Sequence, residues 1–391
     1  MKSHAWDLLR GEPLSRRARR GFRLIVLALI VIAAASLAYL LPSMSSRSTQ
    51  ASPTANHPPV GRPGDIVSYD FVTPFMGWSL VATTALGPGP GRFSVFRTTD
   101  GAKHWQKQFV GGQGRLLGLG PQSVQFFDKD NGFIVVVEGA TDLVYRTADG
   151  GAHWQPVGLP GPGSGVITFR DRGHGWVLVS LGSGADQTVN LYDTGDGGMT
   201  WQRLPDPPPD LAGAITFRGP SEGWSGSKND PMPHVYSSSD GGRSWDRHDL
   251  PLPSGSVPAG AIANVDLLPG IGVVAFLDAL RGDQYALTSF DGGTSWTNVQ
   301  PRPSGNTFGS LDFQDTFHWW AIDRGILYKS SDAGQTWTET SDQLDGAFVY
   351  IPHVLDSRHA WAPVLGTKGT GLALTSDGGL HWMRAGVPQP A

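Results

Sequence analysis

Seven aspartates recur in nearly the same setting along this sequence, and aspartate is a residue type that could act as an acid or a base in catalysis. Each has Ser or Thr two positions before it, then a glycine-containing turn and a Trp, as in TADGGAHW and SSDGGRSW. A catalytic group needs one unique pocket, whereas this motif repeats, so we interpret the aspartates as structural. They are Asp100, Asp149, Asp196, Asp240, Asp291, Asp332 and Asp377, followed by Trp105, Trp154, Trp201, Trp245, Trp296, Trp337 and Trp382.

The motif has the composition of a tight β-hairpin. Aspartate accepts backbone N–H bonds within such a turn, and paired glycines supply its positive-φ positions. Two copies, TTDGAKHW around Asp100 and SSDAGQTW around Asp332, keep one of the two glycines. Successive aspartates lie 41 to 51 residues apart, and a period of this length with several short strands is typical of β-propeller blades.

A second element precedes most hairpins and supplies the other strands. It reads FVTPFMGW up to Trp78 and FRDRGHGW up to Trp176, which predicts a first strand, a polar turn and a second strand that opens with an aromatic residue. We therefore predict an all-β chain: a single seven-bladed β-propeller of four-stranded antiparallel blades over residues 65–391, with one aspartate hairpin in each blade. How the ring closes is left open.

Composition excludes several classes of protein. With 53 Gly and 30 Pro in 391 residues and 16% charged residues, the chain is too rich in turns for a helical bundle, while 39% hydrophobic residues are too many for a disordered chain. The absence of Cys excludes disulfides, thiolate metal sites and a Cys nucleophile. Residues 42–391 carry a net charge of −9, which argues against nucleic-acid binding. No metal-ligand spacing occurs, so we expect no metal and no cofactor.

The N-terminal part predicts attachment to a membrane. We predict a basic cytoplasmic segment at 1–21, a transmembrane signal-anchor helix at 22–42 and a flexible Ser/Pro-rich linker at 43–64. The arginines between Arg16 and Arg23 place the N-terminus in the cytoplasm and residues 65–391 on the extracytoplasmic side of the cell membrane. A cleavable signal peptide is the alternative.

The repeated motif resembles the Asp-box, or bacterial neuraminidase repeat, of a group of β-propellers. An aromatic-opening strand paired with an Asp-box in each unit is most similar to the photosystem II assembly/stability factor-like family. This resemblance implies a scaffold that binds protein partners in the cell envelope, and an arginine patch as the binding surface. The arginines that we assign to such a patch are Arg281, Arg302 and Arg324.

Some Asp-box proteins are glycoside hydrolases, so an enzyme is the alternative function. Residues 65–391 hold only three glutamates, Glu138, Glu222 and Glu339, and no Tyr–Glu pair of the sialidase kind is visible. Aspartates are abundant in the loops, so an inverting hydrolase with two Asp stays open. We expect a non-catalytic protein-binding or assembly scaffold, with an extracellular glycoside hydrolase of the sialidase-like or Asp/Asp inverting type as the alternative.

Overall fold

The computed structural model describes residues 65–83, 92–111, 116–118, 123–138, 141–160, 165–181, 188–228, 232–251, 262–278, 284–299, 310–323, 326–340, 347–348, 352–366 and 369–388. All of them belong to the unit formed by His57–Ala391. They are β-strands and turns, and no helix among them is long and apolar enough to cross a membrane. The predicted basic segment, transmembrane helix and linker at 1–64 lie outside the described residues.

Within the described ranges, hydrogen bonding groups the strands into six antiparallel sheets, and neighbouring strands mostly follow chain order. The first sheet contains β1 (Asp65–Phe71), β2 (Gly77–Thr83), β3 (Arg92–Thr98) and β4 (Gln106–Gly111). The second contains β5 (Leu116–Gly118), β6 (Val124–Phe126), β7 (Gly132–Glu138), β8 (Thr141–Thr147) and β9 (Gln155–Val157), in which β5 and β6 both pair with β7. The third contains β10 (Gly165–Phe169), β11 (Gly175–Leu181), β12 (Thr188–Thr194) and β13 (Gln202–Arg203).

The fourth sheet has eight strands. These are β14 (Leu211–Phe217), β15 (Gly223–Ser227), β16 (His234–Ser238), β17 (Asp246–Asp249), β18 (Ile262–Leu267), β19 (Val273–Asp278), β20 (Gln284–Ser289) and β21 (Thr297–Asn298). Its β14–β17 and β18–β21 halves are each a four-stranded meander, and the pairing of Ser227 with Ala263 joins them.

The last two sheets continue this pattern to the end of the described chain. One contains β22 (Ser310–Phe313), β23 (Trp319–Asp323), β24 (Ile326–Ser330) and β25 (Thr338–Thr340). The other contains β26 (Ala347–Phe348), β27 (His353–Val354), β28 (Ala360–Gly366), β29 (Gly369–Thr375) and β30 (Met383–Ala385), in which β26 and β27 both pair with β28.

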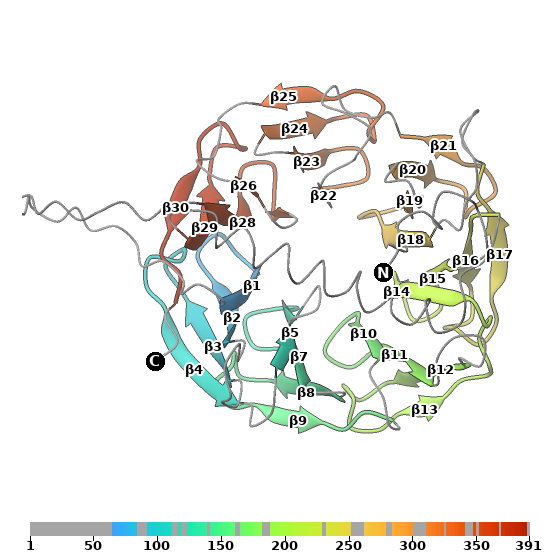
Figure 1. Cartoon of the computed structure of the whole chain (residues 1–391), viewed down its shortest axis with the longest axis horizontal. Coiled ribbons are helices and arrows are strands. Elements are labelled where there is room, and N and C mark those ends of the chain that lie inside the picture. The colour runs from blue at the N-terminus through green and yellow to red at the C-terminus, as the bar shows by residue number, and fades with distance from the viewer. Residues whose placement is uncertain are drawn as a thin grey trace, which may run out of the picture. The chain divides into compact units, whose positions relative to one another are not determined.

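Within residues 57–391 the sheets follow one another around a common centre (Figure 1). The first strands, such as β1, β10 and β22, lie nearest the centre, and the last strands, such as β4, β13 and β25, lie on the outside. This radial arrangement of antiparallel sheets is that of a β-propeller. The prediction of an all-β fold with four-stranded antiparallel sheets is therefore confirmed.

Stacked aromatic rings hold neighbouring sheets together. Trp78 at the start of β2 lies flat on Phe126 at the end of β6, with ring centroids 3.5 Å apart. The same contact joins β11 to the following sheet, where Trp176 stacks on Phe217 at 3.6 Å. Trp78 is fully buried in a cluster with Val124 and Phe126 of the next sheet, so the core lies between the sheets. The aromatic residues that open the second strands therefore act as contacts between sheets.

The last sheet packs against the first. Phe71 of β1 and Trp361 of β28 share one buried cluster with Ala102 and Leu372, and the indole Nε1 of Trp105 donates to the carbonyl of Gly386 at 2.9 Å. The β26–β30 sheet keeps its own outer strand, β30, which pairs with β29. The closure left open by the sequence thus uses side-chain packing between two sheets.

Candidate functional site

The aspartate hairpins, by which we mean the seven Ser/Thr-x-Asp turns, are closed by local hydrogen bonds. The Thr147 hydroxyl donates to Oδ1 of Asp149 at 2.9 Å and accepts from the amide of Gly151 at 2.9 Å. Oδ1 of Asp149 also accepts from the amide of His153, and Oδ2 lies 2.6 Å from its Nδ1. Gly150 and Gly151 take positive φ of 70° and 91°, a backbone that glycine adopts without strain.

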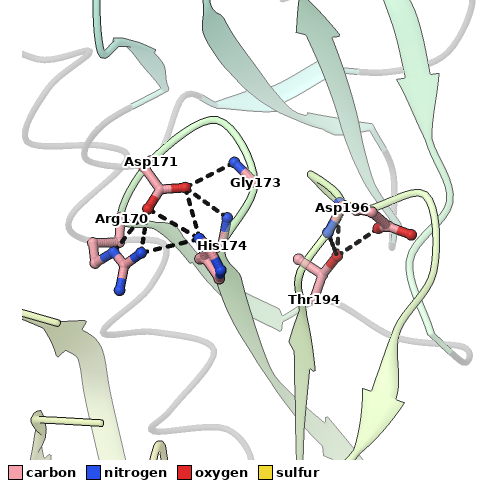
Figure 2. Close-up of polar contacts among 7 residues, drawn as sticks. Arg170, Asp171, Gly173, His174, Thr194 and Asp196 are labelled. Atoms are coloured by element: carbon pink, nitrogen blue, oxygen red, sulfur yellow. Dashed lines mark hydrogen bonds and ion pairs between the residues drawn. The ribbon is translucent and has the colours of Figure 1, made fainter. Parts of the chain in front are cut away.

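The residue before each hairpin Trp completes this network, a role that the sequence analysis did not assign. It is always His, Ser or Thr, and its ring nitrogen or hydroxyl lies within hydrogen-bond distance of Oδ2 of the aspartate, for instance Thr200 on Asp196 at 2.6 Å. Figure 2 shows Thr194 directed at the same aspartate. This position could have been found from the repeat itself. Its members are His104, His153, Thr200, Ser244, Ser295, Thr336 and His381.

A second set of turns, between the first and second strands of the sheets, has its own Asp–His pairs. Asp171 accepts the amides of Gly173 and His174 and lies 3.0 Å from Nδ1 of His174 (Figure 2). The amide of Gly197 in the neighbouring hairpin donates to the carbonyl of Gly173 at 2.7 Å. The two kinds of turn therefore lie on one face, which we call the hairpin face.

The hydrogen bonds keep the hairpin carboxylates ionised. Bonds from the amide and ring of His153 lower the pKa of Asp149 to about 2, and bonds from Thr200 lower the pKa of Asp196 to about 2. Both line a depression of about 560 Å³ together with Arg146 and Arg172. A glycosidase of the two-carboxylate type needs one carboxyl group that stays protonated as the general acid. Neither aspartate of this depression meets that requirement.

A different set of polar side chains lies at the inner strands. Each stands one position before the last residue of its strand and is paired in register with the start of the second strand, as Asp70 is with Trp78 and Asp312 with Trp320. The residue type at this position differs from sheet to sheet, so the seven positions do not all carry the same charge. These inner polar positions are Asp70, Gln125, Thr168, Thr216, Asp266, Asp312 and His353.

Several inner polar side chains bond to the backbone of the following sheet. Asp70 accepts the amide of Phe126 at 2.5 Å, Asp312 accepts the amide of Val354 at 2.5 Å, and Gln125 donates to a carbonyl of the next sheet at 3.2 Å. Nε2 of His353 lies 3.5 Å from Oδ1 of Asp70. The side chains thus form a belt of bonds across the joints between sheets.

The carboxyl groups of this belt titrate in the opposite direction from those of the hairpins. Burial raises the pKa of Asp70 and of Asp312 above the usual value, against the lowering effect of His353 and of the amide bonds. Burial and the charge of Asp312 together raise the pKa of Asp266. These groups hold a proton more readily than ordinary aspartates, but Asp70 and Asp312 are already occupied as backbone acceptors.

An exposed cluster of large hydrophobic residues lies on the hairpin face. Ile271, Phe290 and Phe317 are 62%, 42% and 53% exposed, and the rings of the two phenylalanines are 6.2 Å apart with their planes at 29°. Single exposed hydrophobic residues are common on protein surfaces, whereas contiguous ones mark interaction sites. We call these three residues the apolar patch. The sequence analysis did not single them out.

The opposite side of the sheets holds a buried polar cluster at the starts of β14 and β16. Nε2 of His234 lies 2.8 Å from Oδ2 of Asp210, and the hydroxyl of Tyr236 donates to Oδ1 of Asp210 at 2.8 Å. The His234 side chain is fully buried. Among the residues that the structure describes, no group of three or more His, Asp or Glu side chains could hold a metal ion. The predicted binding residues Arg281, Arg302 and Arg324 lie outside the described residues.

The comparison with solved structures agrees with this fold. No protein-family model and no curated protein matches the chain. Among solved structures it is similar to YCF48 bound to D1 peptide, with 17% identity, a TM-score of 0.54 and coverage of 85% of this chain and 99% of that chain. A GH74 xyloglucanase from Xanthomonas campestris gives 14% identity, a TM-score of 0.51 and coverage of 80% and 59%. A puromycin hydrolase mutant gives 12% identity, a TM-score of 0.52 and coverage of 84% of this chain and 54% of that chain.

The fold and these likenesses define the class: the chain is a β-propeller. It resembles YCF48, and enzymes share the same architecture. A propeller fold hosts many unrelated functions, so the function has to be argued from the side chains.

Proposed function

We propose that this chain is a non-catalytic propeller that binds protein partners in the cell envelope. The observation that carries the proposal is the apolar patch, where the exposed rings of Phe290 and Phe317 lie 6.2 Å apart and the exposed Ile271 belongs to the turn that Thr316 contacts. Burying such a patch against a partner removes apolar surface from water and favours association. The likeness to YCF48, solved with a bound peptide, supports the same reading.

The proposal includes seven blades of the Asp-box type. The period of the aspartate hairpins and the division of the eight-stranded sheet into two meanders support this count. It also includes anchoring through residues 22–42, with the propeller on the extracytoplasmic side, which the apolar run and the preceding arginines support. Arg281, Arg302 and Arg324 are proposed as a further contact surface, on the resemblance alone.

The test is cross-linking in native membranes. Membranes that contain the full-length tagged chain are treated with a lysine-reactive cross-linker, and the products are purified under denaturing conditions and identified by mass spectrometry. We expect one or a few membrane or extracytoplasmic proteins to be recovered reproducibly, and only after cross-linking. Repeated recovery of the propeller alone would contradict the proposal. Release of the chain from membranes by alkaline carbonate would contradict the anchor.

One observation favours a second candidate, an extracellular glycoside hydrolase. The raised pKa of Asp266, Asp312 and Asp70 is what a general acid requires. The use of Asp70 and Asp312 as acceptors for backbone amides of the next sheet counts against it. Assays against a panel of polysaccharides with the purified chain and its Asp266→Asn variant decide this. Turnover by the parent chain that the Asp266→Asn variant lacks would support the enzyme and contradict the non-catalytic scaffold.

A further inference from the structure

Phe290 occupies a hairpin position that does not require an aromatic residue. It stands between the Ser and the Asp of its motif, and the six other copies have Thr, Ala, Gly or Ser at that position. Those copies form the same closing bonds, for example from Thr147 to Asp149 as from Ser289 to Asp291. The fold therefore does not explain the aromatic side chain, which is 42% exposed.

Phe317 and Ile271 occupy equivalent positions in two successive turns. Each precedes the residue whose carbonyl closes its turn, His318 in one case and Gly272 in the other. Phe75 stands at the same position of the first turn and, like Phe317, accepts a hairpin amide with its carbonyl. Phe75 is 66% exposed. In the hairpin motif of the neighbouring last sheet, the position that corresponds to Phe290 is occupied by Ser376. Phe75 is thus a matched comparison residue without an aromatic neighbour from that hairpin.

The apolar patch is held in place by the backbone around it. The hydroxyl of Thr316 donates to the carbonyl of Pro269 at 2.6 Å, which ties the two turns together. The ring of Phe290 lies over Gly272, where an added Cβ would come within 2.7 Å of it. A surface fixed in this way loses little conformational entropy when a partner binds.

The charges beside the apolar patch are negative. Asp291 follows Phe290, and bonds from Ser295 lower its pKa to about 2. Asp315 lies two residues before Phe317, and its pKa is lowered by bonds from His318 and the Phe317 amide, although burial opposes this. Both are ionised at neutral pH. Residues 42–391 as a whole carry a net charge of −9.

Arg218 also reaches this region, and its guanidinium is already engaged. Arg218 forms an ion pair with Glu222 and donates to the carbonyl of Gly272. An apolar surface bordered by the ionised carboxylates of Asp291 and Asp315 suits an apolar segment that carries its own positive charges.

From this combination, and resting on the proposed function, we infer that the apolar patch docks a peptide segment of a partner protein in which large apolar side chains are flanked by Lys or Arg. Phe290 and Phe317 supply the contact that anchors the segment, and the carboxylates of Asp291 and Asp315 select its flanking charges.

The test uses a displayed library of short random peptides. The library is selected on the purified full-length chain in detergent, and the enriched peptides are synthesised and measured by fluorescence anisotropy against the chain and its variants. We expect enriched peptides to combine Leu, Ile, Phe or Trp with Lys or Arg. The double variant Phe290→Ser/Phe317→Ser is expected to weaken their binding at least about tenfold. The control variant Phe75→Ser is expected to bind within about twofold of the parent chain.

Three outcomes would overturn the inference: selection that enriches no peptide, equal binding by the double variant, or enrichment of acidic peptides. Thermal unfolding of each variant shows whether the double variant still folds, and single variants replace it if it does not. The cross-linking experiment on native membranes does not depend on these residues. If the double variant still captures the same partner there, the inference fails while the proposed function stands.

Discussion

The indole of Trp361 lies flat against the phenyl ring of Phe71, with ring centroids 4.2 Å apart and planes 11° apart. Trp361 belongs to β28 in the last sheet and Phe71 to β1 in the first. The same aromatic contact joins other neighbouring sheets, as between Trp78 and Phe126. The joint between the first and last sheets is therefore built like the joint between the first and second sheets.

This joint predicts a large loss of stability on truncation. Trp361→Ala removes a buried ring that packs on Phe71, and we expect a loss of about 3–5 kcal/mol in the free energy of unfolding. Urea denaturation followed by far-UV circular dichroism measures it. The control is Phe75→Ala, which removes a side chain that is 66% exposed and is expected to change stability by about 0.5 kcal/mol or less. A Trp361→Ala variant as stable as that control would contradict the role of this contact.

The aspartate hairpins predict a loss of stability in acid. The folded pKa of Asp149 and of Asp377 is about 2, below the ordinary value of 3.8. A lowered folded pKa means that the unfolded chain binds protons first as the pH falls, so stability present above pH 3.8 is lost towards pH 2. We expect the thermal midpoint to fall across this window. An Asp377→Asn variant should have a lower midpoint at pH 5 and a smaller further fall, and a midpoint unchanged from pH 4 to pH 2 would contradict the prediction.

Asp266 predicts the opposite dependence of stability on pH. Its folded pKa is raised by burial and by the charge of Asp312, so the folded chain binds the proton more tightly and ionisation costs stability as the pH rises above 3.8. Asp266→Asn should therefore raise the thermal midpoint at pH 7 and change it little at pH 3. As a comparison, Asp70→Ala leaves the amide of Phe126 without its acceptor and should cost about 1–3 kcal/mol. A lower midpoint for Asp266→Asn at pH 7 would count against this account.

The polar cluster opposite the hairpin face predicts that two aspartates of the connection between β13 and β14 differ in their contribution to stability. Asp210→Ala removes the acceptor of both His234 and Tyr236, and the former is fully buried. We expect this to cost about 2 kcal/mol or more. Asp206→Ala removes a surface ion pair with Arg203, whose partners are 80% and 54% exposed, and should cost about 0.5 kcal/mol or less. Chemical denaturation of both variants compares them, and equal losses would show that the cluster adds no stability.

Much of the fold could be predicted because its signals are local. The bonds that close a hairpin lie within a few residues, as from the Thr147 hydroxyl to Asp149 and from the His153 amide to Asp149, so the motif contains its own explanation. The contact of the residue before each hairpin Trp with the aspartate was missed, and so was the equally local pairing of Asp171 with His174. The positions of strands and turns also follow from the regular spacing of the hairpin aspartates along the sequence.

The candidate site could not be predicted in the same way. Phe290 and Phe317 lie in turns of different sheets, and Asp70 meets His353 only because the chain returns to its starting point. Contacts between residues so far apart in the sequence leave no local sequence pattern. The resemblance directed the prediction to Arg281, Arg302 and Arg324 instead.

The sequence by itself determined that this chain forms antiparallel strands with one closed turn in each repeat, because Asp, Ser or Thr, and Gly satisfy that turn within a few residues. Only the tertiary structure decided which polar side chains bond across the inner joints and which hydrophobic ones stay uncovered. The physical reason is that burial and charge at a position depend on residues that other sheets bring beside it. Local bonds make the hairpins, and packing between sheets makes the surface at which a partner can bind.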